Sequence, residues 1–328
     1  PNESVSWPTT AIVTITHVVR RTRATVKTLL SEGEALVVHL AGLPPVLSSR
    51  DGSESLNAAE LEVKAGDLWV MSWDCSYLGL VCVAAVKQGY ILGWPVTLPE
   101  EPAFAPALVV NHTPLCMPLF LWPTRETGLG MHLLHRPLGR VIEPQSIQRI
   151  AWAMEDGEDP GMSFAPGSAA DAANTEADEA MVERWASLCF HTWPEAGACY
   201  LSETKIKNAG GTASRMADCL GLSPVDLRPL WTGVKPASEE QLAEVARVLG
   251  VEASTLLDDD PMGEAVERLA APLFKEPLLG LASQVGITEG VARDRARSQY
   301  ALAARDDSLE VSDTRLMDAI RRAAEAND

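Results

Sequence analysis

The chain has 328 residues, 46% of them hydrophobic, and a formal net charge of −18. At about 100–200 residues per domain, this length predicts two or three domains with cores of their own. The acidic balance excludes a protein that coats nucleic acid non-specifically, and the lack of an apolar run of roughly 18 residues excludes a membrane partner. Duplex recognition stays open, because it needs lysine and arginine only at the contact surface.

Residues 1–153 read mainly as short strands rich in Val, Leu and Trp, separated by Gly, Pro or Asn. Such a pattern predicts a small β-barrel domain. We expect helices at residues 17–31 and 144–153. The expected strands are residues 35–40, 67–73, 80–87, 90–97, 107–110, 119–122 and 131–134.

Within this half, GDLWV at residues 66–70 opens a strand, hydrophobic strands follow, and LGRVI at residues 138–142 precedes a helix. This order, over residues 60–152, resembles the MazF/Kid family of small SH3-like barrels that cut RNA. The resemblance implies an arginine just before the second strand and a threonine at the end of the next strand. Thr97 fits the threonine, but residues 77–79 read YLG and offer no arginine.

Phosphate-ester cleavage needs a cation to stabilise developing charge, so a lone threonine is insufficient. We therefore expect no catalytic residues and a catalytically silent barrel that binds a partner. The exception would be a fold in which Arg125 or Arg136 lies where the missing arginine would stand. His132 and His135 could form half of a metal site, yet no second pair of ligands completes the motif, and we expect no metal. No P-loop, GxGxxG, HExxH or GxSxG occurs, and we expect no cofactor.

Residues 154–180 are small and acidic, contain no Lys or Arg, and hold one aromatic residue, Phe164. This composition cannot bury enough surface to offset its ordering entropy, and it predicts a disordered linker. The six cysteines form no CxxC pair, which favours a reducing bacterial cytoplasm. The first residues lack the basic and apolar stretches of a signal peptide.

Residues 181–258 predict a first helical domain. Gly221 can end one helix, Ser223 can cap the next, and Ser238 with Gln241 forms a capping-box pattern. With Trp231, these features over residues 213–257 resemble the Cro/repressor-like (XRE-type) helix-turn-helix family. The expected helices are residues 181–191, 213–220, 224–231, 239–249 and 253–257.

In that family the helix after the turn enters the DNA major groove. Here this helix offers one cation, Arg228, and an interior proline, Pro229, that would disturb it. Thr212, Ser214 and Lys235 could hold phosphates. The alternative is a helical module kept for packing or dimerisation.

Residues 259–328 predict a second helical domain, with helices at 263–270, 278–284, 288–304 and 313–325. Thr288 would cap the third of these, in a second helix-turn-helix-like unit at residues 278–300. Its exposed face would contact DNA because guanidinium groups suit guanine edges and phosphates. That face consists of Arg293, Arg295, Arg297, Ser298 and Gln299. The alternative is a solvated arginine face with salt bridges to Glu289 and Asp294.

The sequence therefore predicts a multi-domain protein with an N-terminal SH3-like barrel and C-terminal all-α helix-turn-helix domains. We expect a homodimeric transcriptional regulator that binds double-stranded DNA, of a toxin–antitoxin or phage-defence locus. One alternative is a toxin-type protein that binds or cuts RNA. Another is a scaffold whose barrel binds a protein partner.

Overall fold

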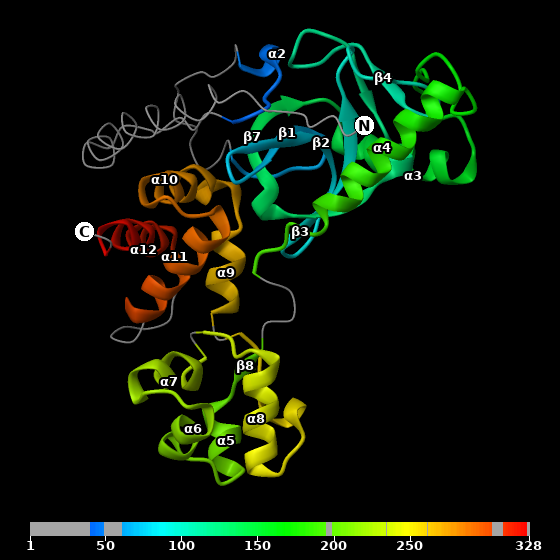
Figure 1. Cartoon of the computed structure of the whole chain (residues 1–328). Helices are drawn as coiled ribbons and strands as arrows, with labels where there is room; N and C mark the ends of the chain where they lie inside the picture. Colours follow the sequence, from blue (N-terminus) through cyan, green and yellow to red (C-terminus); the bar gives the residue numbers. More distant parts are fainter. Residues whose placement is uncertain are drawn as a thin grey trace, which may run out of the picture.

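The computed structural model describes residues 40–48, 61–194, 199–233, 235–260, 262–303 and 311–326 (Figure 1). The helix expected at residues 17–31 lies outside these ranges, as does the strand expected at 35–40 except for its last residue. Within them the chain has the two-part layout that the sequence predicts, a β-rich N-terminal part and a helical C-terminal part. A short helix, α2 (Pro45–Ser48), precedes the sheet.

The N-terminal part is a curled antiparallel sheet in the order β4-β5-β3-β2-β1-β7, with β6 also paired to β3. Two predicted strands have the expected bounds, residues 67–73 and 90–97. The expected strand at residues 131–134 is wrong, because a 3-10 turn, η2 (Met131–Leu133), stands there. The strands are β1 (Asp67–Trp73), β2 (Ser76–Val86), β3 (Tyr90–Thr97), β4 (Leu108–Val110), β5 (Leu119–Leu121), β6 (Thr127–Gly130) and β7 (Leu134–Arg140).

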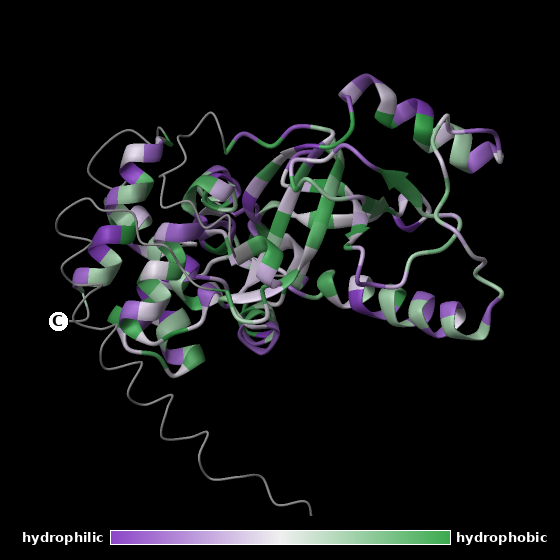
Figure 2. Cartoon of the chain, turned by 90° about the horizontal axis from the view of Figure 1, so that it is seen from above, coloured by the Kyte–Doolittle hydropathy of each residue, from purple (hydrophilic) through white to green (hydrophobic). Residues whose placement is uncertain are grey.

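The sheet is buried on both faces, which explains why its strands are apolar without alternation (Figure 2). Leu68 and Val70 of β1 enter one core, which α3 (Pro144–Asp156) covers with Ile147 and Ile150. Trp69 and Met71 enter the other, which α4 (Ala172–Leu188) covers with Trp185 and Leu188. Helix α4 thus belongs to the barrel side rather than to the helical domain.

The prediction of a disordered linker at residues 154–180 is wrong. Residues 163–168 lie along the edge of the sheet, where Val109 N donates to Ser163 O at 2.9 Å and Ala165 N to Ala107 O at 2.8 Å. Helix α4 then begins at Ala172. Backbone hydrogen bonds order this stretch, and they do not require apolar side chains.

Residues 199–258 form a separate helical unit, which hangs apart from the sheet in Figure 1. Its core draws only on residues 199–257. Strands β8 (Tyr200–Leu201) and β9 (Leu257–Asp258) pair and bring its two ends together. Between them lie α5 (Glu203–Asn208), α6 (Ala213–Leu220), α7 (Pro224–Trp231), α8 (Glu239–Leu249) and η3 (Ala253–Leu256).

After this unit the chain returns to the sheet with four more helices, which share one core with Trp193. Figure 1 shows them beside β1 and β7. They are α9 (Gly263–Leu269), α10 (Lys275–Val285), α11 (Glu289–Ala303) and α12 (Asp313–Glu325), with η4 (Pro272–Phe274) before α10. In the described ranges, no helix combines the length and apolarity needed to cross a bilayer.

Candidate functional site

Helices α6 and α7 are joined by three residues whose conformation follows the sequence prediction. Gly221 ends α6 in the left-handed region (φ 62°), which costs glycine no steric penalty. The Ser223 hydroxyl accepts a hydrogen bond from Asp226 N and so starts α7. Ser238 and Gln241 form the reciprocal capping box that starts α8. The predicted bounds of all three helices are confirmed.

The outer surface of this unit carries the residues assigned to phosphate and base contacts. Thr212 caps α6 through Arg215 N, and Ser214 stands exposed in the first turn. Arg228 and Lys235 are exposed, on α7 and in the loop after it. The structure therefore places all four predicted contacts on one compact unit and at its surface.

Two features limit α7 as a reading helix. The carboxylate of Asp226 accepts a hydrogen bond from the Ser223 hydroxyl at 2.6 Å, which fixes a negative charge at the tip of the helix. Val225 beside it is 79% exposed and offers only an apolar contact. Pro229 does not break the helix, which continues to Trp231. Arg228 thus remains the one cation of the helix itself.

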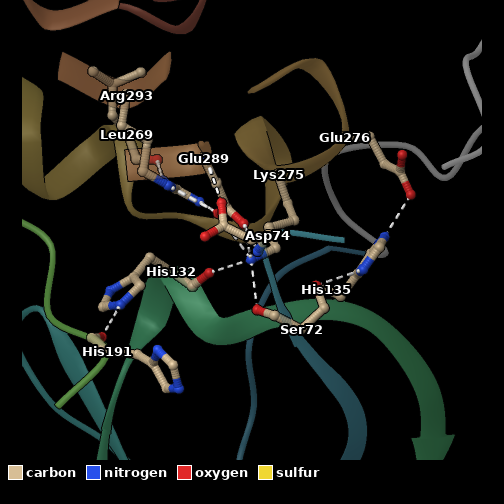
Figure 3. A network of polar contacts seen from close by, with 10 residues as sticks. All are labelled: Ser72, Asp74, His132, His135, His191, Leu269, Lys275, Glu276, Glu289 and Arg293. Atoms are coloured by element: carbon tan, nitrogen blue, oxygen red, sulfur yellow. Dashed lines mark hydrogen bonds and ion pairs between the residues drawn. The ribbon is translucent and has the colours of Figure 1, made fainter. Parts of the chain in front are cut away.

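Helix α11 differs from the prediction at its central arginines. Arg293 is 0% exposed. Its guanidinium donates to Glu289 Oε1 at 3.0 and 2.7 Å and to Leu269 O at 2.6 Å (Figure 3). The Glu289 salt bridge was the alternative interpretation, but it is buried rather than solvated. Arg293 therefore cannot read DNA, because it is buried between α9 and the rings of Trp73 and Trp193.

Lys275 completes this buried cluster from the first turn of α10. Its Nζ donates to Ser72 O at 2.7 Å, His132 O at 2.8 Å and Glu289 Oε1 at 2.9 Å. Burial lowers the pKa of Lys275 to about 8, and the Glu289 carboxylate opposes that shift. Burial raises the pKa of Glu289, but Lys275 and Arg293 outweigh it and hold the carboxyl below its ordinary range. One carboxylate thus pairs with two buried cations, and the three side chains together carry a net charge of +1.

The loop between β1 and β2 supplies the start of α11. Asp74 and Cys75 form its two-residue turn, both in the left-handed region (φ 48° and 58°), which Asp adopts more readily than most non-glycine residues. The Asp74 carboxylate accepts from Glu289 N at 2.5 Å, and Asp74 N donates to Glu289 Oε2 at 3.3 Å. A strained turn of the sheet therefore caps a helix 215 positions later in the sequence.

The two histidines of the possible metal half-site belong to the same region and have protein partners. His132 Nε2 lies 2.6 Å from His191 O, and burial with the Arg293 charge lowers the His132 pKa to about 3. His135 lies between Ser72 Oγ at 2.8 Å and Glu276 Oε1 at 2.5 Å. All three N–H donors of Lys275 are used as well. The cluster therefore joins sheet to helices and leaves no ammonium proton for a substrate.

Arg297 is also buried, at 5% exposure, which corrects its assignment to DNA. Its Nη2 lies 2.6 Å from Asp260 Oδ1, and its guanidinium lies 4.9 Å from the Tyr200 ring centre. Thr288 is exposed and accepts from Val291 N at 3.4 Å, as expected of its cap role. The other predicted contacts of α11 line an open groove of about 320 Å³ with α12, namely Arg295, Ser298 and Gln299.

A second cavity, of about 230 Å³, lies between the sheet and α4 and is lined by Thr97, Glu101 and Trp122. Arg184 of α4 reaches into it, and its Nε and Nη2 donate to Leu78 O at 3.0 and 2.5 Å. The guanidinium of Arg184 thus lies beside residues 77–79, the segment in which the sequence offers no arginine. Sequence reasoning missed it because α4 was assigned to the helical domain.

The two arginines that the sequence offered as replacements lie elsewhere. Arg125 pairs with Asp178, and Arg136 donates to Leu47 O at 3.0 Å. No known protein family, curated protein or solved structure matches this chain. Function must therefore be argued from the α6–α7 surface, the α4 cavity and the groove on α11.

Proposed function

We propose that the chain is a DNA-binding transcriptional regulator whose α6–α7 unit contacts the duplex. One observation carries the proposal: α6, the left-handed turn at Gly221 and the capped helix α7 have the order and length of a helix-turn-helix, with α7 open to solvent. The neighbouring α8 and η3 complete a self-contained core behind them. In such units the second helix lies in the major groove and the flanking residues position it on phosphates.

The expected contacts divide by chemistry. Arg228 is suited to a base edge or a phosphate, and Lys235 to a phosphate. Thr212 and Ser214, at the first turn of α6, can donate to phosphate oxygens. With few cations on the surface, binding has a shallow salt dependence, since each phosphate contact contributes about 0.9 to the logarithmic slope.

The test is fluorescence anisotropy of the full chain on duplex DNA from upstream of its own gene, at low and moderate salt. Arg228→Ala and Lys235→Ala should each weaken binding, and Lys235→Ala should lower the salt slope by about one. The matched control is Arg247→Ala, which should leave binding unchanged. Arg247 is an exposed arginine of α8, and helix α8 lies on the other side of the unit from α7 in Figure 1. If the wild-type chain shows no specific binding at either salt, the proposal fails.

A second candidate function, RNA binding by the sheet, has one observation in its favour. Arg184 and Thr97 line the same cavity, so a cation and a hydroxyl stand together at the place where the sequence offered only the threonine. Thr97 Oγ1 accepts from Trp122 Nε1 at 3.1 Å, and Arg184 Nη1 lies 3.7 Å from Glu101. The full chain and its Arg184→Gln variant, incubated with single-stranded RNA, test this: equal retention and intact RNA in both would dismiss it.

A third candidate is a scaffold whose sheet binds a protein partner. It makes the opposite prediction for the α6–α7 surface. Arg228→Ala would then leave DNA retention unchanged, and the chain would enrich a protein rather than a DNA fragment. The anisotropy series therefore separates this candidate from the first.

A further inference from the structure

The α5–α8 unit leaves the rest of the chain and rejoins it at one place. Strands β8 and β9 pair Tyr200 with Asp258 and Leu201 with Leu257. Ser202 N adds a hydrogen bond to Leu256 O at 2.9 Å. Because the unit's apolar core is internal, the contacts that orient it lie where its two connecting segments pass α11.

Helix α11 holds both segments within one of its turns. On the outgoing side, Trp193 Nε1 donates to Asp294 Oδ1 at 3.0 Å, while the indole lies in the core of α9–α12. On the returning side, Arg297 donates to Asp260 at 2.6 Å. Residues three apart on a helix share a face, so Asp294 and Arg297 act side by side.

The returning side is the firmer of the two. The side chains of Arg297 and Asp260 are only 6% and 16% exposed. Tyr200 is 6% exposed, and the Arg297 guanidinium lies over its ring. Asp260 also accepts a hydrogen bond from Met262 N at 2.8 Å, which ties the pair to the start of α9. A buried, stacked and paired guanidinium holds its geometry better than a solvated one.

We propose that Asp294 and Arg297 form a clamp that fixes the orientation of the α6–α7 unit relative to α11. Arg297 is then a positioning residue for DNA binding and does not touch DNA itself. The inference rests on the proposed function for its consequence, since an α6–α7 unit that is already held in one orientation can enter the major groove without losing orientational freedom on binding. The clamp itself is defined by contacts alone.

The experiment compares the full-length chain with Arg297→Ala, and uses Arg321→Ala, an exposed arginine of α12, as the control. Backbone ¹⁵N relaxation reports whether residues 199–258 tumble with the sheet. Anisotropy on the duplex that the wild-type chain selects from a random-sequence pool reports affinity. We expect one common tumbling time in the wild type and in Arg321→Ala. In Arg297→Ala we expect faster tumbling of the unit and about tenfold weaker binding, equivalent to about 1.4 kcal/mol.

Arg297→Lys keeps the charge beside Asp260 but loses the planar guanidinium over Tyr200. Its tumbling time and its affinity for DNA should therefore lie between those of the wild type and those of Arg297→Ala. It also replaces Arg297→Ala if that variant does not fold. Common tumbling in both variants overturns the clamp, and faster tumbling with unchanged affinity overturns the positioning role. If the wild-type chain selects no duplex, the proposed function fails by itself, while the relaxation comparison still decides on the clamp.

Discussion

Glu289 offers the sharpest test of how the sheet and the helices are joined. Glu289→Gln keeps the volume of the side chain and removes the carboxylate that Lys275 and Arg293 share in their buried cluster. Removing one partner of a buried ion pair costs about 3–5 kcal/mol, because the remaining charge stays desolvated. Two cations depend on this carboxylate, so we expect the upper half of that range.

Urea unfolding measures this loss through tryptophan fluorescence. The Trp73 ring lies 5.4 Å from Lys275 Nζ and 5.9 Å from the Arg293 guanidinium carbon, so it reports on the cluster directly. With a slope of about 2–3 kcal/mol/M, the midpoint should fall by about 1–2.5 M. The control is Glu325→Gln, an exposed carboxylate on α12.

A midpoint for Glu289→Gln that matches the control would refute the reasoning, since it would mean that the cations do not need this carboxylate. A second variant separates charge from packing. Replacing Lys275, Glu289 and Arg293 together by Met, Leu and Met removes every charge of the cluster. This triple variant should be more stable than Glu289→Gln, because well-packed apolar residues often equal or exceed a buried ion cluster.

Three further predictions concern stability. The pKa of His132 is lowered to about 3, so below pH 6.5 the unfolded chain binds a proton that the folded chain does not bind. The free energy of unfolding should therefore fall by up to about 1.4 kcal/mol per pH unit below pH 6.5. Urea midpoints measured across pH should fall less steeply in His132→Gln than in the wild type. Gly66→Ala should prevent folding, since its Cβ would lie 1.9 Å from Ile142 O. Gly89→Ala is the control, because its Cβ has open space and the substitution costs only the strain of a positive φ. Circular dichroism should show a folded spectrum for Gly89→Ala alone. Ser238→Ala should cost about 1 kcal/mol in thermal unfolding, through loss of the α8 cap.

The parts of the fold that depend on local chemistry were predictable from the sequence. Gly221, Ser223 and Ser238 act on backbone groups within three or four residues, so their roles could be inferred without any knowledge of the rest of the chain. The same holds for β1 and β3, whose apolar runs and flanking turns define them. Turn chemistry and capping are properties of short segments.

The misassigned residues depend on distant partners. Arg293 and Arg297 look like an exposed basic face in the sequence. In the fold, distant residues cover both of them: Leu269, Trp73 and Trp193 cover the first, and Asp260 and Tyr200 cover the second. Residues 163–168 have a linker's composition, yet the open edge of the sheet orders their backbone. Arg184 reaches Leu78 across 106 positions of sequence. No residue-level pattern records such pairings, because they are set by which elements the tertiary fold brings together.

The bond from Lys275 to the carbonyl of Ser72 has a consequence for the order of folding, since it spans 203 positions of sequence. On the ribosome, where segments emerge in chain order at about 5–20 residues per second, the sheet is complete tens of seconds at most before α10 and α11 can reach it. During that interval the β1–β2 turn has no helix to cap, and the side of the sheet next to β1 and β7 is not yet covered by α9–α12. The α5–α8 unit, whose apolar core is internal, can fold before α9–α12 emerge. Synthesis therefore passes through a state that exposes the flank of the sheet, and chaperones that bind apolar surface would act there.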